Sequence, residues 1–540
     1  MIPSTIYDQL KKVRASKTLE LSPTPLLRKE IEGLDGTIQP FRLRYYQGQG
    51  IYHLLVVPRM VLGDGTGLGK TVEAIGALCY LWAKDPSFKV LVVCPKSAIR
   101  QWAGEIRRFT NGVKAIIGTG SIKEREKAYR EWVDSDQPSV LITNYHLLVR
   151  DWDAGAGKEP GLLDKLTASK KLVTIFDECT AFKNPATKTH QTCKFVSARS
   201  VRVYGLTATL LKNNLIEGFG IYKVIVPDLF STKTDFLRRF CITELRRVPG
   251  GAKIPIIVGY QNLQEFRTTI DPHFYGRPKH MVSEELPNLT TREVICELSR
   301  AEEEKYKEAL SGVLEHGDGE IRDYQETKDL TSLIYAQEVV DSLALIGIED
   351  DTGAKERALL DLLSEEFDGE KVVIYTQFET LVTRLQKLLA KEKIKSVRIT
   401  GKESDAAREK AKATFQNTSS GVDVIFITNA GSEAINLQMA VAMIFVDTPW
   451  VWGDYVQLLG RMIRIGSPHP SVLAIHLISM RPNREPKRQE TIDHKKVKAL
   501  RKKKGVIDQV IGEAAVGALR FERSVDTVRE IIDAMKEDAV

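Results

Sequence analysis

The sequence predicts an α/β fold in which two parallel-sheet lobes follow each other in tandem, with helical insertions between them and a helical C-terminal tail. Short β-branched apolar runs alternate with amphipathic helical patterns over residues 61–206, and this alternation returns after residue 355. The intervening residues, 214–350, show mostly helical patterns. A chain of 540 residues is also too long for a single hydrophobic core.

These patterns divide the chain into five segments. We expect a lead-in at residues 1–38, a first lobe at 39–235, helical protrusions and a linker at 236–352, a second lobe at 353–490, and a basic helical tail at 491–540. The lead-in mixes helix and loop patterns, and neither it nor the closing residues 508–540 suggest a function.

A glycine-dense loop within residues 61–78 (VLGDGTGLGKTVEAIGAL) organises the first lobe. Glycines let successive backbone N–H groups point at phosphate oxygens, Lys70 can reach the outer phosphates, and the Thr71 hydroxyl can bind magnesium. The strict GxxxxGK[ST] pattern fails because Asp64 stands where its first glycine belongs, so a glycine-rich turn is the alternative. We predict nucleotide contacts from Gly67, Leu68, Gly69, Lys70 and Thr71.

Two adjacent carboxylates, Asp177 and Glu178, follow a strand pattern at residues 171–176. Carboxylates at the end of a buried strand are costly unless they face a metal or solvent. Downstream of a phosphate loop, Asp177 would bind the magnesium and Glu178 would orient and deprotonate the attacking water. The carboxyl ends of parallel strands share one edge of the sheet, so loop and acidic pair should lie together in a RecA-like nucleotide-binding lobe.

Two further stretches of the first lobe suggest contacts with the adenine base and with a nucleic-acid backbone. Gln47 lies one short helical pattern before the phosphate loop, and its amide can read N6 and N7 of adenine, although a solvated glutamine is the alternative. Lys96 and Ser97 follow a strand pattern at residues 89–95 and could hold a nucleic-acid backbone. Trp102 follows on a helix and should also pack on the sheet.

The second lobe repeats the strand–helix alternation without a phosphate loop of its own. Strands are expected at residues 372–375, 397–400, 423–428, 442–447 and 472–478. Arg461 and Arg464 are three apart, which predicts one helical face, with Gln457 one turn earlier. Guanidinium groups at this spacing suit the γ-phosphate of a nucleotide bound by the neighbouring lobe, whereas a surface ion pair is the alternative.

Composition fits a soluble globular protein. Hydrophobic residues make up 43% and charged residues 28%, no apolar run is long enough to cross a membrane, and the six cysteines form no CxxC pair. The net charge of +7 permits a polyanionic partner. The basic run at residues 495–504 is either a solvated helix face or an electrostatic hold on DNA phosphates. We expect a monomer that acts in the cytoplasm.

Eleven short motifs follow one another along the chain. They are LRYYQ (43–47), DGTGLGKT (64–71), VVCPKSAIRQW (92–102), LITNYHLL (141–148), DECTAFKNP (177–185), LTATLLKNN (206–214), KVVIYTQF (371–378), VRITG (397–401), ITNAGSEAINLQMA (427–440), DTPW (447–450) and QLLGRMIRIGS (457–467). Taken in this order, they resemble the motifs of the Swi/Snf-type ATPases, which are double-stranded DNA translocases of helicase superfamily two. The resemblance covers about residues 40 to 480 and implies two RecA-like lobes that bind ATP and Mg²⁺ between them and hold DNA across one face.

The resemblance also implies DNA contacts near these motifs and a linker around Arg277, Lys279 and Leu286-Pro287. Four places depart from the family pattern: Gly65 replaces a glutamate, Thr180 replaces the histidine of the acidic box, Ser467 replaces a glutamine, and the usual Trp-Asn-Pro reads Trp-Val-Trp at residues 450–452. The implied DNA contacts are Lys96, Ser97, Trp102, Asn144, Tyr145, Gln377, Gly401, Thr428 and Trp450.

Two alternatives to a translocase stay open. A strand-separating DNA or RNA helicase of the same superfamily would need a wedge, and the sequence shows no such element. A slow ATP-gated DNA clamp would move little, although the complete hydrolytic set argues against an inactive one. The absence of recognisable targeting modules suggests a compact enzyme from a bacterium or from a virus-infected cell.

Overall fold

The computed structural model describes two compact units. Unit 1 comprises residues 1–240 and 262–284, and unit 2 comprises residues 241–261 and 285–540. Parts of three motifs (209, 212–214, 430–434 and 465–466), Lys279, and most of residues 502–540 lie outside the described residues. The described residues are 3–19, 21–32, 38–153, 171–208, 210–211, 215–247, 253–277, 286–317, 319–323, 328–349, 352–429, 435–464, 467–482, 489–498, 500–501 and 519–520.

Unit 1 is built on a seven-stranded sheet whose strands all run parallel. One of its interior strands, β4 (Lys89–Cys94), has the sequence KVLVVC, and five of these six residues are buried, as expected for a strand covered on both faces. In sheet order the strands are β11 (Phe274–Tyr275), β3 (Arg59–Leu62), β8 (Arg202–Leu206), β7 (Leu172–Asp177), β4 (Lys89–Cys94), β6 (Ser139–Asn144) and β5 (Lys114–Ile117).

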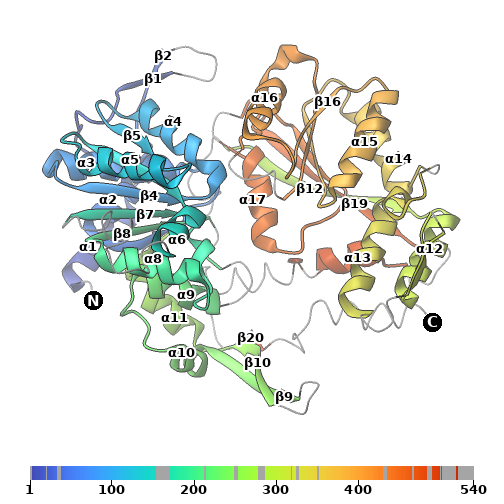
Figure 1. Cartoon of the computed structure of the whole chain (residues 1–540), viewed down its shortest axis with the longest axis horizontal. Coiled ribbons are helices and arrows are strands. Elements are labelled where there is room, and N and C mark those ends of the chain that lie inside the picture. Colours follow the sequence, from blue (N-terminus) through green and yellow to red (C-terminus); the bar gives the residue numbers. More distant parts are fainter. Residues whose placement is uncertain are drawn as a thin grey trace. The chain divides into compact units, whose positions relative to one another are not determined.

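Helices cover both faces of this sheet. Helices α3 and α4 pack together on one side, and α6, α8 and α9 pack on the other (Figure 1). The helices of unit 1 are α1 (Ser4–Ala15), α2 (Tyr45–Val56), α3 (Lys70–Lys84), α4 (Ile99–Phe109), α5 (Ile122–Val133), α6 (Tyr145–Asp153), α8 (Lys188–Arg199), α9 (Ile216–Ile225), α10 (Lys233–Phe240) and α11 (Leu263–Ile270). A short hairpin of β1 (Glu30–Glu32) and β2 (Ile38–Pro40) precedes α2.

Unit 2 has a six-stranded parallel sheet. Its order is β12 (Asn288–Glu297), β19 (Ser471–Met480), β18 (Ala442–Phe445), β15 (Val372–Tyr375), β17 (Val424–Ile427) and β16 (Ser396–Ile399). Its described helices include α12 (Arg300–Ser311), α13 (Lys328–Asp341), α14 (Ala354–Asp361), α15 (Glu379–Lys391), α16 (Asp405–Gln416) and α17 (Trp452–Met462). Two tandem parallel-sheet lobes are therefore confirmed.

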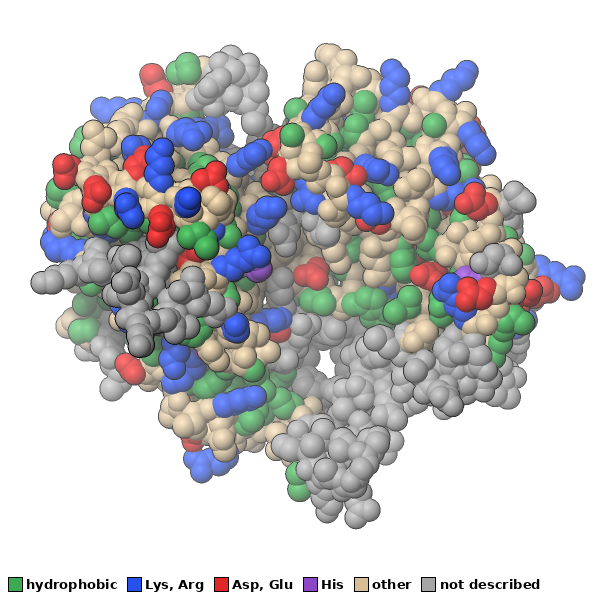
Figure 2. Space-filling view, in the orientation of Figure 1, with side chains coloured by type: hydrophobic (Ala, Val, Ile, Leu, Met, Phe, Trp, Pro, Cys, Tyr) green, Lys and Arg blue, Asp and Glu red, His purple; other side chains and the backbone are tan. Residues whose placement is uncertain are grey.

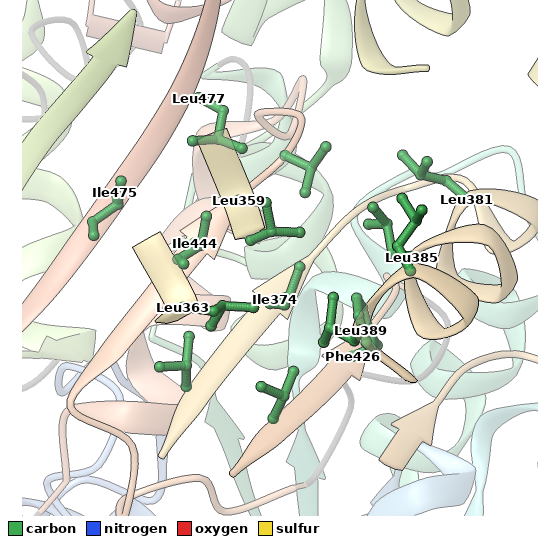
Figure 3. Close-up of a cluster of buried hydrophobic side chains, with 14 of the residues drawn as sticks. Leu359, Leu363, Ile374, Leu381, Leu385, Leu389, Phe426, Ile444, Ile475 and Leu477 are labelled. Atoms are coloured by element: carbon green, nitrogen blue, oxygen red, sulfur yellow. The ribbon is translucent and has the colours of Figure 1, made fainter. Parts of the chain in front are cut away.

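Alternation along the strands of unit 2 forms two cores. Leu381, Leu385 and Leu389 recur every four residues on one face of α15 and pack with Ile374 of β15 (Figure 3). The next residue, Tyr375, points to the opposite face and packs with α17. This second core fixes α17, which carries Gln457 and Arg461, against the sheet.

The prediction of a helical region between the lobes is wrong in part. Residues 288–297 form β12, the edge strand of the second sheet, and β9 (Cys241–Arg247) pairs with β10 (Lys253–Tyr260) in an antiparallel hairpin. Helix α12 ends at Ser311 because Gly312 adopts φ 92°, and the hairpin of β13 (Val313–Glu315) and β14 (Ile321–Asp323) follows. Strand β12 pairs with residues 471–480, far along the chain, and the pattern within residues 288–297 does not indicate that partner.

The expected tail is not entirely helical either. β20 (Leu519–Arg520) pairs antiparallel with β10, whereas residues 492–498 are helical. Within the residues that the structure describes, no helix is both long and apolar enough to cross a bilayer.

Candidate nucleotide-binding site

The phosphate loop joins β3 to α3 in unit 1 and depends on its glycines. Gly67 and Gly69 have φ angles of 84° and 89°, a region that residues with a side chain rarely adopt. A Cβ on Gly69 would also lie 2.7 Å from the side-chain nitrogen of Gln47. The Lys70 ammonium donates to the carbonyl oxygens of Asp64 (2.8 Å) and Gly65 (3.4 Å), so it lies along the inside of the loop.

The acidic pair follows β7, which is separated from β3 in the sheet only by β8. Both Trp102 Nε1 (2.8 Å) and the Glu178 backbone N–H (3.0 Å) donate to the Asp177 carboxylate, and the Tyr145 hydroxyl donates to the Asp177 carbonyl (2.7 Å). Glu178 itself adopts φ 50°, which costs backbone energy in a non-glycine residue. The two carboxylates are thus held in a defined, strained turn.

The electrostatics of these groups fit a phosphate and a divalent cation. Burial and the Glu178 charge raise the pKa of Asp177 to about 6, while Trp102 and Lys70 oppose the rise. A cation beside this carboxylate would offset the free-energy cost of burying its negative charge. Burial lowers the pKa of Lys70, and the nearby acidic charges, Glu178 first, oppose that change. Thr66 Oγ1 is buried in the loop without a partner among the described residues, as expected for a group that faces a ligand.

Gln47 lies beside the phosphate loop, 6% exposed. Its side-chain nitrogen donates to the Leu68 carbonyl (3.3 Å), and its oxygen accepts from the Arg44 backbone N–H (3.1 Å). Both amide groups thus have protein partners in this structure, and adenine recognition by Gln47 stays a prediction.

Two family models match the chain. The SNF2-related domain matches residues 46–345, more than half of the chain, and the helicase conserved C-terminal domain matches residues 354–466. This chain belongs to the SNF2-related family. The first match contains the phosphate loop and also reaches β12, α12 and α13 of unit 2, and the second match contains α17.

Individual relatives of the SNF2-related chain are considerably longer than the matched region. A mouse chromodomain-helicase-DNA-binding protein 1-like is 27% identical over 85% of this chain and 50% of its own length. An uncharacterized ATP-dependent helicase of Mycoplasma pneumoniae is 23% identical over 78% of this chain and 39% of its own. The chain therefore spans half or less of the length of these relatives. The Sulfolobus solfataricus SWI2/SNF2 ATPase core in complex with dsDNA is 23% identical, covers 95% of this chain and 99% of its own, and has a TM-score of 0.40.

The SNF2-related chain presents most of the implied DNA contacts at the carboxyl ends of strands. Lys96 and Ser97 follow β4, Asn144 and Tyr145 lie at the end of β6, and Gln377, Gly401, Thr428 and Trp450 follow β15, β16, β17 and β18. Trp102 is the exception, because it is 1% exposed and bonded to Asp177. Asn144 and Thr428 are buried as well, at 7% and 5% exposed, so DNA contacts by these three residues stay predictions.

The second lobe differs from the expected arginine arrangement. Helix α17 ends at Met462, and Ile463 has an extended backbone, so Arg461 and Arg464 do not share a helical face. Arg464 instead folds back, with Nε donating to the Gly460 carbonyl (3.0 Å) and Nη1 donating to Asn436. A cation that satisfies the last carbonyls of a helix is favourable there. Roles of Gln457, Arg461 and Arg464 in hydrolysis stay predictions.

Two residues outside the nucleotide site are also placed unexpectedly. Lys496 of the basic run is 1% exposed, donates to Gln337 (3.1 Å) and lies over the Trp450 ring, so it cannot bind DNA phosphates. Arg277, expected in a DNA-contacting linker, is 8% exposed and paired with Asp64 of the phosphate loop. No local signal in the sequence separates such a buried cation from a solvated one.

Proposed function

We propose that this chain is an ATP-dependent motor that hydrolyses ATP and thereby moves along double-stranded DNA or remodels protein–DNA complexes. The main support is the placement of a phosphate loop and an Asp-Glu pair at one edge of a parallel sheet, within a chain of the SNF2-related family. The names of relatives, which include an ATP-dependent helicase, agree with this proposal.

Each residue of the site has a proposed task. The loop amides and Lys70 bind the phosphates, and Gln47 reads the adenine. Thr71 and Asp177 would hold Mg²⁺, and the bound ion would supply positive charge against that of the phosphates. Glu178 orients the attacking water and accepts its proton. Among the described residues no cluster of three or more metal-binding side chains exists, which suits Mg²⁺ bound by few protein ligands and by the substrate's phosphates.

We further propose that Arg461 and Arg464, with Gln457, act on the γ-phosphate. This proposal rests on their position in QLLGRMIRIG and on the absence of a second phosphate loop in the sequence. Such arginines are worth about three to five orders of magnitude in rate in other nucleotide hydrolases.

The DNA partner is proposed from the family and from the residues that follow the strands. Figure 2 shows basic and acidic side chains mixed over the drawn face, so net charge alone does not mark a DNA path. The proposed contacts are Lys96, Ser97, Trp102, Asn144 and Tyr145 in unit 1 and Gln377, Gly401, Thr428 and Trp450 in unit 2.

A triplex-displacement assay, run beside a duplex-unwinding assay, tests the proposed motion. A translocase displaces a third strand from duplex DNA in an ATP-dependent reaction without separating the duplex. Unwinding of the duplex would instead support the strand-separating helicase, and ATP turnover without displacement would support the slow ATP-gated DNA clamp.

A further inference from the structure

A segment more than 200 residues downstream forms one side of the phosphate loop. Strand β11 pairs in parallel with β3, with Phe274 opposite Val61. The hydrogen bonds continue past both strands, since Gly63 N–H donates to the Tyr275 carbonyl (2.6 Å) and Gly65 N–H to the Arg277 carbonyl (3.0 Å). The Arg277 N–H donates in return to the Asp64 carboxylate (3.1 Å). We call residues 274–277 the loop clamp.

Two glycines permit this close approach. A Cβ on Gly63 would lie 2.4 Å from the Phe274 ring, and a Cβ on Gly276 would lie 2.7 Å from the Gly63 carbonyl oxygen. Any side chain at either position would force the loop clamp away from the loop. The loop therefore takes its shape from the clamp as well as from its own glycines.

The Arg277 side chain completes the clamp by compensating buried acids. Its guanidinium makes two bonds to the Asp64 carboxylate, one of them at 3.0 Å from Nε, and lies 3.4 Å from the Glu73 carboxylate. Asp64 and Glu73 are both fully buried. Such carboxylates are stable only with a paired cation, and a forked guanidinium fits one carboxylate at two points. Asp64 is thus tolerated in the loop because its charge faces Arg277.

The same guanidinium also joins the loop to two N-terminal helices. Arg277 donates to the Tyr46 carbonyl and to Gln49 Oε1 (3.0 Å), both on α2. The Gln49 side-chain nitrogen donates to the Val13 carbonyl (3.0 Å) at the end of α1. One buried network therefore connects α1, α2, the phosphate loop and the loop clamp.

We propose that Arg277 is a positioning residue for the phosphate loop, and that through it nucleotide binding is coupled to the loop clamp. The clamp lies just before residue 284, where unit 1 ends. The proposal rests on the proposed nucleotide binding at this loop. Because coupling between two equilibria is reciprocal, a nucleotide that stabilises the loop must also stabilise the clamp.

The test compares Arg277→Gln with Arg277→Lys and with Arg125→Gln as a matched control. Arg125 forms another buried ion pair in unit 1, with Asp151, and it does not contact the loop. Affinity for ATP-Mg²⁺ is measured by equilibrium binding, and hydrogen exchange is followed at the amides of Gly63, Gly65 and Arg277. Melting temperatures are recorded for every variant.

We expect Arg277→Gln to weaken ATP binding by about tenfold or more, because the loop loses its positioning partner. The ATP affinity of Arg277→Lys should lie between that of Arg277→Gln and that of the wild type, since one ammonium cannot reproduce the two-point contact of a guanidinium. ATP should slow exchange at the Arg277 amide in the wild type and in Arg125→Gln, but not at the corresponding amide of Arg277→Gln. The control should keep its ATP affinity within about twofold even if its melting temperature falls.

Unchanged ATP affinity in Arg277→Gln, or an equal loss in Arg125→Gln, would overturn the proposal. If Arg277→Gln does not fold, Asp64→Asn removes the same ion pair with little change in shape and must show the same loss. A wild type that binds no ATP refutes the proposed function instead. In that case faster exchange at Gly63 and Gly65 in Arg277→Gln than in Arg125→Gln still supports the clamp, and equal exchange refutes it.

Discussion

Replacing Lys355 by methionine should strongly destabilise unit 2. The Lys355 ammonium lies 2.7 Å from Asp341 and 2.8 Å from Asp493, and it donates to the Val446 carbonyl (2.7 Å). All three ionic side chains are at most 1% exposed. The variant would therefore leave two carboxylates buried without their cation.

The magnitude follows from this burial. Loss of one partner of a buried ion pair costs about 3–5 kcal/mol, compared with roughly 5–15 kcal/mol for the total stability of a domain. At about 2–4 °C for each kcal/mol, the melting temperature should fall by about 6–20 °C. Asp493 belongs to the tail residues, so the same variant should release residues 492–498 from unit 2.

Calorimetry and limited proteolysis of the full chain would measure both effects. Lys402→Met is the control, because its ion pair with Glu379 is 75% and 29% exposed and should contribute less than about 1 kcal/mol. Adding Asp341→Asn to Lys355→Met should recover part of the loss, since one buried charge is then removed. A melting temperature of Lys355→Met within about 2 °C of the wild type would refute this reasoning.

Three further predictions concern the site and the response to acid. Trp102→Phe removes a hydrogen bond to Asp177 but keeps the packing, so ATP turnover should fall by about tenfold with little change in melting temperature; unchanged turnover would contradict this. Arg464→Ala should lower ATP turnover at least about a hundredfold while ATP affinity stays similar. A smaller effect would indicate that Arg464 serves only to bond the Gly460 carbonyl at the end of α17. Burial lowers the pKa of His53 to about 3 and of His476 to about 4. Both histidines are neutral in the folded chain and take up protons near pH 6.5 in the unfolded chain. The free energy of unfolding is therefore at its full value above pH 6.5 and decreases below it by about 1.4 kcal/mol per pH unit for each histidine. Urea unfolding at pH 7, 6 and 5 should show that fall, and His53→Gln or His476→Gln should flatten it.

The central strands and the phosphate site could be predicted because local chemistry determines them. β4, β7 and β15 are rich in β-branched residues, buried on both faces and followed by proline or a polar residue, so they end within one or two residues of the predicted limits. The phosphate loop could be predicted for the same reason, because its glycines and Lys70 are neighbours in the sequence.

Features that depend on distant partners could not be predicted in this way. β12 is an edge strand with mostly exposed side chains, and its ten residues pair with β19, almost two hundred residues away. Arg277 resembles any basic linker residue until the fold brings it to Asp64. Arg464 was expected on a helix because its spacing from Arg461 is helical, but the helix ends first and its side chain then bonds to Gly460.

Steady-state ATP hydrolysis by the wild type and Glu178→Gln tests the central claim most directly. The assay compares no nucleic acid, duplex DNA, single-stranded DNA and duplex RNA at saturating ATP and Mg²⁺. A duplex-DNA motor predicts strong stimulation by duplex DNA that is lost in Glu178→Gln, whose ATP binding persists. Stimulation only by single strands or RNA, or hydrolysis that survives in Glu178→Gln, would contradict the account.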